Sequence, residues 1–459
     1  MPERFTVLLM AAGRGTRMRS SLPKVLHPVC GRPMVEWVIE AARAAGAGEV
    51  VCVTRPGDGV ADGLPDTVTV AEQREGEGTG AAVLAARGQA SESGTTVVLS
   101  GDHPLVSREL IEHLVETHES AGAAATLLTT EELDPAGYGR IVRADDGSVD
   151  RIVETKHIDG LSESELAIRE INIGAYAFEA ADLWPALEQV GEERGELYLT
   201  GVLPALRERG RTVAAHLTTD VRSAMGVNDR ADLLGVEEVA QRQILESHAH
   251  AGVTFLNPSS TRVEAGVEIG EETRVEAGVT LRGATKVGAG CVLGPATTIT
   301  DSTLGDGVTA LHSYLVEAEV DDRATLGPFA YLRPGARIGA GAKIGTFVEV
   351  KNSSIGADTK VPHLSYIGDA DVGENSNIGA GNITANYDGK NKHRTTIGRG
   401  VKTSVDTSFV APVSVGDEAY TGAGSVITED VPEGALGIAR SKQRNVEGYA
   451  QRKKDETPG

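Results

Sequence analysis

Aromatic residues make up only 4% of this chain, and cysteine occurs only as Cys30, Cys52 and Cys291. An odd number of cysteines without metal-ligand spacing argues against a disulfide framework and a zinc cluster. Reduced thiols are the better interpretation, so we expect a cytoplasmic protein. Because the sequence has neither a signal-peptide pattern nor a run of about twenty apolar residues, we expect no membrane span.

Basic residues are also in short supply. The chain has 44 Lys and Arg against 66 Asp and Glu, a formal net charge of −22. This charge disfavours nucleic acid or an anionic membrane as a partner. Small anionic substrates remain possible, since they need only a local basic pocket. The length of 459 residues allows two or three domains.

Glycine is abundant, and much of it falls in a six-residue repeat between residues 263 and 428. A period of six suits a strand of about four residues with a corner of about two, and three such blocks close one coil. Stacked coils bury one another's apolar rows. The glycines that follow a repeated residue are expected to adopt positive φ at corners; they are Gly270, Gly288, Gly294, Gly339, Gly345 and Gly356. The repeated positions are Val263, Ile269, Val275, Leu281, Val287, Leu293, Ile299, Ile338, Ile344, Val350, Ile355, Val361, Ile367, Ile397, Thr403, Phe409, Val415, Thr421 and Ile427.

This pattern resembles the left-handed parallel β-helix of hexapeptide-repeat acyltransferases. Two segments disturb the repeat. Residues 304–326 blur the register, and residues 386–396 break it as an arm looping out of a coil would. Insertions in a solenoid collect on one side, which is often the functional side.

The first motif lies near the N-terminus. An apolar run at residues 5–10 precedes AAGRGTRM, a strand followed by a glycine-rich turn. Gly13 and Gly15 would let the backbone approach a phosphate, and Arg14 and Arg17 would supply charge. An ordinary strand-to-helix turn would give the same short pattern.

The following segment carries Pro23-Lys24 and then an amphipathic helix, with Met34, Trp37, Val38 and Ala41 on one face. Together the two segments read L-x-x-A-A-G-x-G-T-R-M…L-P-K, which resembles the signature of sugar-nucleotide pyrophosphorylases. The resemblance implies an α/β nucleotidyltransferase domain with a Rossmann-like mixed sheet over residues 1–230. Further strands are expected at residues 50–54, 68–70 and 96–99.

The resemblance also implies roles for individual residues. Lys24 and Arg17 would stabilise charge during the reaction, and Gly139, Glu154, Asn172 and Asn228 would hold the sugar phosphate. Asp102 follows a strand at the edge where ligands bind in α/β sheets, and with Asn228 it would bind Mg²⁺. The implied nucleotide-binding residues are Met10, Ala11, Ala12, Gly13, Lys24, Gln73, Gly78, Thr79, Ser100 and Gly101.

The chain departs from this family at several places. Gly76-Glu77 stands where Gln-Leu is usual, and Ala81 replaces a histidine. Gly201 replaces an aspartate, and Asp229 an asparagine. These differences leave the affinity for the base open, but not the class of reaction.

Residues 231–251 predict a helix with an apolar face. We interpret it as a linker between the first domain and a β-helix domain at residues 252–459. It could equally be the terminal helix of the first domain.

Polar residues gather near the interruptions of the repeat. Arg333 and Lys351 are 18 residues apart, one coil, and His363 and Tyr366 follow nearly one coil later. An aliphatic β-helix core does not explain such a cluster. A basic pocket with one imidazole suits a sugar phosphate and an amine nucleophile, and Glu349 could orient the imidazole.

Over essentially its whole length the sequence resembles the bacterial bifunctional N-acetylglucosamine-1-phosphate uridylyltransferases/glucosamine-1-phosphate acetyltransferases. This implies synthesis of UDP-N-acetylglucosamine, a cell-wall peptidoglycan precursor, from glucosamine 1-phosphate with acetyl-CoA and UTP as co-substrates. It implies His363 as the catalytic base and sugar-phosphate binding by Arg333, Lys351, Tyr366 and Asn377. The implied acetyl-CoA site comprises Ala380, Asn386, Tyr387, Val405, Ala423 and Arg440. Val405 replaces the family's serine.

A homotrimer is expected as well, because a three-sided β-helix can bury one flat face per subunit around a threefold axis. The arm at residues 386–396 would then reach a neighbouring subunit. Two other hypotheses remain: a pyrophosphorylase whose β-helix serves only assembly, and a regulatory scaffold with decayed sites. Arg333, Lys351, His363 and Tyr366 argue against the first, and intact Lys24, Asp102, Asn228 and His363 argue against the second.

Overall fold

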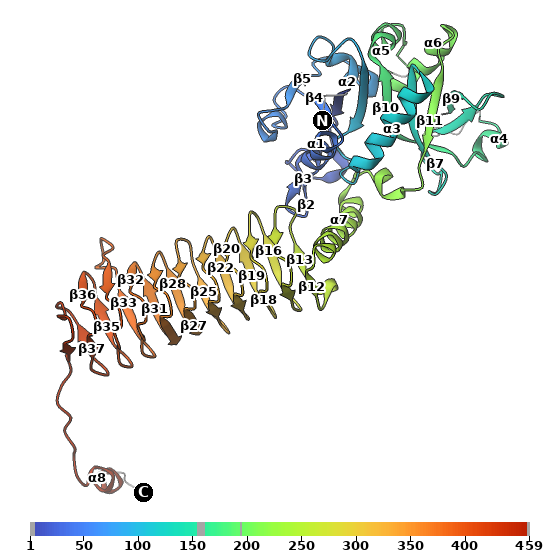
Figure 1. The fold of residues 1–459 in the computed structure, drawn as a ribbon. Helices are drawn as coiled ribbons and strands as arrows, with labels where there is room; N and C mark the ends of the chain where they lie inside the picture. The colour runs from blue at the N-terminus through green and yellow to red at the C-terminus, as the bar shows by residue number, and fades with distance from the viewer. Residues whose placement is uncertain (1–4, 154–160, 193–194, 457–459) are drawn as a thin grey trace. The chain divides into compact units, whose positions relative to one another are not determined.

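The computed structural model describes residues 5–153, 161–192 and 195–456 (Figure 1). The chain divides into two compact units, Met1–Gln243 and Ile244–Gly459. The division falls within α7 (Arg230–His250), the helix predicted over residues 231–251. Glu237 of α7 accepts a hydrogen bond of 2.8 Å from the Cys30 amide in the first unit, and Leu245 packs in the core of the second.

The first unit is built on a mixed sheet with strand order β11-β7-β10-β6-β1-β4-β5, to which β8 and β9 attach through β10. Strands β1, β4, β5 and β6 run parallel, and β10 runs antiparallel between β6 and β7. The strands are β1 (Phe5–Met10), β4 (Ala47–Thr54), β5 (Thr69–Glu72), β6 (Thr95–Ser100), β7 (Ala125–Thr130), β8 (Arg140–Arg143), β9 (Val149–Val153), β10 (Ile171–Glu179) and β11 (Val213–Leu217). Each predicted strand is present as β1, β4, β5 or β6.

Helices cover both faces of this sheet, which explains why its strands are continuous apolar runs. Val7 and Leu9 pack with α1 (Met34–Ala44) and α3 (Arg108–Ala121). Leu8 faces the other way, toward the core formed with α2 (Thr79–Ala85), α5 (Ala180–Leu187) and α6 (Val202–Glu208). The buried face of α1 differs from the prediction, because Trp37 and Ala41 are only half-buried. The buried residues are Met34, Val35, Val38, Ile39 and Ala42.

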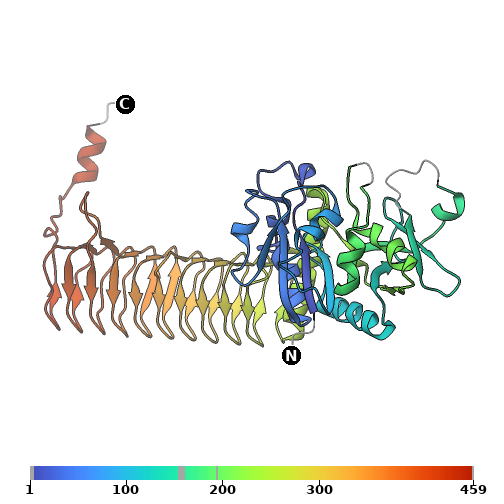
Figure 2. The ribbon, with the colours of Figure 1, turned by 90° about the horizontal axis from the view of Figure 1, so that it is seen from above.

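The second unit is a parallel β-helix of three sheets, which confirms the predicted fold (Figures 1 and 2). The first sheet contains β12 (Thr254–Phe255), β15 (Arg274–Val275), β18 (Val292–Leu293), β21 (Thr309–Ala310), β24 (Thr325–Leu326), β27 (Lys343–Thr346) and β30 (Lys360–His363). The second contains β13 (Arg262–Val263), β16 (Thr280–Arg282), β19 (Thr298–Thr300), β22 (Tyr314–Val316), β25 (Tyr331–Leu332), β28 (Glu349–Lys351), β31 (Tyr366–Gly368), β33 (Ile383–Ala385), β35 (Ser408–Val410) and β38 (Val426–Ile427). The third contains β14 (Glu268–Ile269), β17 (Lys286–Val287), β20 (Thr303–Leu304), β23 (Glu319–Val320), β26 (Arg337–Ile338), β29 (Ser354–Ile355), β32 (Ala370–Val372), β34 (Thr395–Ile397) and β36 (Val413–Val415).

Every repeated residue named from the sequence is buried. The pairing joins Val263 to Leu281 and Leu281 to Ile299, each 18 residues apart, whereas Ile299 pairs with Leu315, only 16 residues on. The blurred segment at residues 304–326 is therefore a shortened coil, and its strands continue without an insertion.

The glycines after the repeated residues have a different role from the predicted one. Of the six, only Gly294 has a positive φ. A Cβ on Gly270 would lie 2.6 Å from the Ala289 nitrogen, and one on Gly356 would lie 2.5 Å from the Glu374 nitrogen. These glycines are required because the next coil approaches too closely for any side chain.

The arm at residues 386–396 stands out from the coils between β33 and β34 (Figure 2). It folds back on itself through a bridge between Tyr387 and Lys392, and the His393 ring lies 2.8 Å from the Asp388 carboxylate. The chain then ends in β37 (Tyr420–Thr421), β39 (Leu436–Gly437) and α8 (Tyr449–Asp455). No helix in the described part of the chain combines the length and apolarity needed to cross a membrane.

Candidate functional sites

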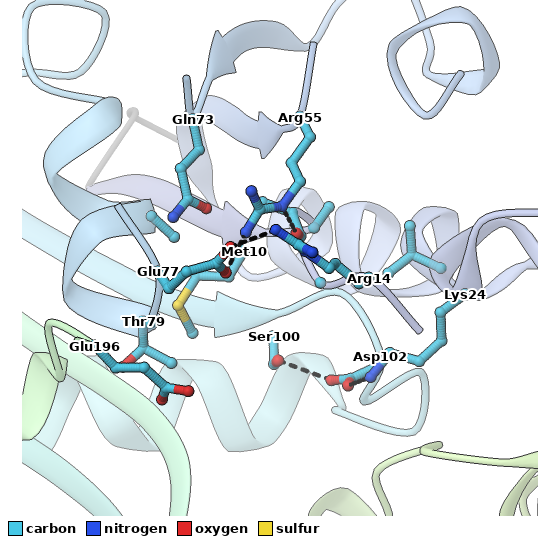
Figure 3. A pocket seen from close by; sticks show the side chains of 16 residues that line it. Met10, Arg14, Lys24, Arg55, Gln73, Glu77, Thr79, Ser100, Asp102 and Glu196 are labelled. Carbon is cyan, nitrogen blue, oxygen red and sulfur yellow. Dashed lines mark hydrogen bonds and ion pairs between the residues drawn. The ribbon is translucent and has the colours of Figure 1, made fainter. Parts of the chain in front are cut away.

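A pocket of about 260 Å³ opens where β1, β4, β5 and β6 end (Figure 3). The carboxyl edge of parallel strands is where α/β sheets bind ligands. Each predicted nucleotide-binding residue except Gly101 lines this pocket, and the Gly101 amide donates to the Met10 carbonyl at 2.9 Å. The remaining lining residues are Arg14, Val25, Arg55, Glu77, Ala82, Asp102 and Glu196.

The glycine-rich turn brings Lys24 to this pocket. Gly15 has φ 58°, and a Cβ there would lie 2.7 Å from the Lys24 Cβ. Only glycine allows that backbone conformation together with so close an approach. The second glycine of the motif therefore fixes where the lysine stands.

Asp102 is the centre of a polar cluster at the pocket's far end (Figure 3). Lys24 forms an ion pair with its carboxylate, Ser100 donates to it at 2.7 Å, and the His103 ring lies 2.9 Å away. Burial alone would raise the pKa of Asp102, but His103 and Lys24 outweigh burial and hold that pKa well below its usual range. The carboxylate is therefore ionised at neutral pH.

The predicted Mg²⁺ ligands come from adjacent segments. The Val227 amide donates to the Asp102 carbonyl at 2.9 Å, so the backbone of the next residue, Asn228, lies close to that of Asp102. The Asn228 side-chain oxygen accepts from Arg17 at 2.8 Å, so both candidate ligand oxygens already face a cation. Among the described residues, no three His, Cys, Asp or Glu side chains gather as a metal cage. One carboxylate and one amide oxygen fit Mg²⁺, which takes its other ligands from phosphate and water.

The predicted sugar-binding residues are partly brought together. The Asn172 amide donates to the Gly139 carbonyl at 2.9 Å, and the Asn172 side chain donates to the Tyr176 hydroxyl at 2.7 Å. Neither residue lines the pocket just described. Glu154 lies outside the described residues.

Sequence reasoning gave Arg55 and Glu196 no role. Arg55 directly follows β4, a position that could have singled it out as Asp102 was singled out. Its Nε donates to the Ala12 carbonyl at 2.7 Å, and its Nη2 donates to Glu77 at 2.6 Å. Glu196 stands five residues before Gly201 and lines the pocket.

Three of the family departures have steric explanations. A Cβ on Gly76 would lie 3.0 Å from the Ala81 Cβ, so these two small residues fit each other. A Cβ on Gly201 would lie 2.5 Å from Val190 Cγ1, so an aspartate there would require Val190 to move. At these positions, the packing of a neighbouring residue accounts for the small side chain found in this sequence.

The second cluster lies on the outer face of the β-helix's second sheet. Arg333 follows β25 and Lys351 ends β28, on successive coils as the spacing predicted. Lys351 pairs with Asp369 at 3.3 Å, and Asn386 also donates to Asp369. The Tyr366 hydroxyl accepts from Asn386 at 3.4 Å.

Two further residues complete this cluster. Asp369 is buried, one coil after Lys351, and its position could have been found from the same spacing that linked Lys351 to Arg333. Lys392 reaches back from the arm, and contact with Lys351 lowers the pKa of Lys392. Arg333, Lys351 and Lys392 thus converge, and Glu349 and Asp369 compensate only part of their charge.

Glu349 does not orient His363, contrary to the prediction. Its carboxylate accepts from Arg333 at 2.9 Å. The exposed His363 side chain makes no hydrogen bond to any described residue. The reason is that Glu349 lies on the second sheet and His363 on the first, across a corner of the β-helix.

His363 is the first in a column of residues stacked on successive coils, and the residues after it are predicted to bind acetyl-CoA. The Gly381 amide donates to the His363 carbonyl at 3.2 Å, the Asp406 amide to Ala380 at 2.8 Å, and the Gly424 amide to Val405 at 2.9 Å. His363, Ala380, Val405 and Ala423 therefore stack on successive coils. Asn377 lies away from the cation cluster, bridged to Lys360 and Lys402 on the first sheet's side. Tyr387 and Arg440 are exposed.

The sequence was compared with known proteins. Residues 7–215 match the family model of the MobA-like NTP transferase domain. The bifunctional protein GlmU of Mycolicibacterium vanbaalenii is 46% identical over 461 residues, covering 98% of this chain and 93% of that protein. The protein of the same name from Mycobacterium tuberculosis strain H37Ra is 45% identical and covers 100% of this chain and 94% of its own. That of Shouchella clausii is 43% identical and covers 98% and 100%.

Proposed function

This chain belongs to the GlmU family of bifunctional uridylyltransferases and acetyltransferases, and we propose that the Lys24 pocket and the Lys351 cluster are its two active sites. The observation that carries the proposal is that residues far apart in sequence converge at two places. One is a sheet-edge pocket that ends in an ionised aspartate, and the other is a group of cations on the second sheet of the β-helix, one corner away from the exposed His363.

In the pocket, the first unit joins a sugar 1-phosphate to UTP. A phosphate oxygen of N-acetylglucosamine 1-phosphate attacks the α-phosphorus of UTP, and pyrophosphate leaves. The Ala11–Ala12–Gly13 turn and Gln73 hold the nucleotide, and Lys24 and Arg17 offset the charge that develops on the phosphate oxygens. Asp102 and Asn228 would hold Mg²⁺, which would supply further positive charge at the phosphates.

In the second unit, the amine of glucosamine 1-phosphate attacks the thioester carbonyl of acetyl-CoA. The C–N bond forms, the C–S bond breaks, and coenzyme A leaves as the thiol. His363 accepts the proton from the amine. Arg333, Lys351 and Lys392 hold the phosphate, because clustered ammonium and guanidinium groups bind a dianion best.

One assay tests both assignments. The purified protein is given glucosamine 1-phosphate, acetyl-CoA and UTP, while free thiol and pyrophosphate are followed separately. We expect both products, and expect pyrophosphate alone when N-acetylglucosamine 1-phosphate replaces glucosamine 1-phosphate and acetyl-CoA. If pyrophosphate is released without thiol, the protein is only a pyrophosphorylase. If neither product is released, the protein is a regulatory scaffold.

The protein is also proposed to be a cytoplasmic homotrimer. Its three cysteines are buried, in keeping with reduced thiols. An apolar ladder stacks at one corner of the β-helix, with Phe329 52%, Phe347 59% and Leu364 62% exposed. The two phenylalanine rings are stacked, with centroids 5.3 Å apart. A contiguous exposed apolar ladder marks an interaction surface, and a second copy of the chain is the proposed occupant.

Asp102→Ala and Asn228→Ala should each lose uridylyl transfer and require more Mg²⁺ for what remains. Each variant removes one ligand oxygen from a site that offers few protein ligands. Metal titrations of uridylyl transfer measure the effect, with Asp66→Ala, an exposed acid of the same unit, as the control. A variant that titrates like wild type does not lack a ligand.

Acetyl transfer should depend on assembly, while uridylyl transfer should not. The cation cluster and Asn377 lie on different sheets of one chain, so a site containing both is completed by a second copy. Sedimentation and both assays across a dilution series check this, and thiol release should fall as the trimer dissociates. A monomer that acetylates at full rate would overturn the shared site.

A further inference from the structure

Arg55 connects the two walls of the nucleotide pocket. Its Nε donates to the Ala12 carbonyl in the glycine-rich turn, and its Nη2 donates to Glu77 on the opposite loop. Its own amide donates to the Asp58 carboxylate at 2.9 Å, which fixes its backbone. The Arg55 side chain is 24% exposed, and its guanidinium lies between Gln73 and Arg14 in the pocket (Figure 3).

At the other end, the Glu77 backbone is held as well, while its side chain is 44% exposed. The Glu77 carbonyl accepts from the Leu197 amide at 2.8 Å. The next residue, Gly78, has φ 98°, and a Cβ there would lie 2.5 Å from the Leu197 carbonyl oxygen. The backbone of the loop is therefore fixed by Leu197, and the Glu77 side chain extends toward Arg14 and Arg55.

The second arginine on Glu77 is a weaker partner. Arg14 donates to Glu77 at 2.7 Å, but its side chain is 69% exposed. Exposed ion pairs contribute little because water and salt screen them. The less exposed Arg55, with two fixed acceptors, is the rigid part of the arrangement.

We propose that the base lies beside Gln73, at the end of the pocket away from Asp102, and that the Arg55–Glu77 ion pair braces this end and makes these two residues specificity-determining for uracil over purine nucleotides. The inference rests on the proposed uridylyl transfer and deepens it. Ala12 and Gln73 stand on the two walls that the brace connects, so the brace sets the space between them. A purine has one more ring than uracil and enters only if the walls separate. The family's leucine at the position of Glu77 could not accept a hydrogen bond, so this chain uses charge where its family uses an apolar side chain.

Two variants test the brace. Arg55→Lys keeps the positive charge but replaces a fixed fork by a single ammonium group, which cannot hold both acceptors in the same geometry. Glu77→Ala removes the carboxylate that accepts the hydrogen bond from Arg55. Both kcat and KM are measured with UTP, ATP and GTP, with Arg211→Ala, an exposed ion-pairing arginine of the same unit, as the control.

Loss of a hydrogen bond to a charged group corresponds to about a tenfold to hundredfold change. We therefore expect each variant to raise the kcat/KM for purine nucleotides relative to UTP by about tenfold, mainly through KM. The double variant should lose no more selectivity than the single variant with the larger loss, because both substitutions break the same connection.

Wild-type selectivity in both variants, or losses that add independently, would overturn the brace. A wild-type protein that does not use UTP would overturn the proposed function itself. Far-UV circular dichroism, thermal unfolding and residual turnover with UTP report on folding of the first unit in every variant, so a general loss of folding is recognised. If Arg55→Lys does not fold, Glu77→Ala alone decides.

Discussion

Lys24→Ala should lower the turnover of uridylyl transfer by about a hundredfold or more, which is typical for the loss of one preorganised charge contact at a reacting centre. Lys24 is held at the pocket by Gly15 and forms an ion pair with Asp102. Without it, the Asp102 carboxylate keeps only Ser100 and His103 as partners, and the triphosphate loses a fixed cation. The loss should appear in kcat, since charge develops on the phosphate oxygens during the reaction.

Acetyl transfer by the same variant is the internal control, because Lys24 belongs to the other unit. Arg74→Ala is a matched control, since it removes one positive charge from the loop beside Gln73 without removing a pocket-lining side chain. Uridylyl transfer should be unchanged in this control. Near-full uridylyl transfer by Lys24→Ala would show that the lysine only balances the charge of Asp102.

The β-helix could be predicted from the sequence because its core is a one-dimensional pattern. Each repeated residue, from Val263 to Ile427, is buried at the position that the period of six assigned to it. The glycines were predicted for the wrong reason. Positive φ and a close neighbouring backbone both require the absence of a Cβ, so the sequence cannot distinguish a corner from the contact between Gly270 and Ala289.

The nucleotide pocket was predictable for a similar reason. Its residues directly follow strands, and parallel strands bring their carboxyl ends together, as with Met10 and Ser100. Hydrogen bonds and ion pairs between side chains of different loops were not predictable. Glu77 was noticed only as a departure from its family, and its partner Arg55 lies 22 residues earlier on another strand end. Glu349 was assigned to His363 although a corner separates them.

The last prediction concerns His363 itself. His363→Ala should abolish thiol release from acetyl-CoA and leave uridylyl transfer unchanged. The exposed imidazole has no hydrogen-bond partner among the described residues, and it begins the column that continues through Ala380 and Val405. Nothing in the β-helix core requires it, so its removal should leave the fold unchanged. The proton of the attacking amine would then have no acceptor.

His312→Ala provides the matched control. His312 is a histidine at the same corner, and its ring contacts Phe329 in a tilted arrangement with ring centroids 5.4 Å apart. Both variants remove an imidazole from the edge of the apolar ladder, but only His363 adjoins the acetyl-CoA column. Equal losses in the two variants, with dissociation in sedimentation, would mean that the corner acts through assembly. An acetylating His363→Ala trimer would show that another group takes the proton.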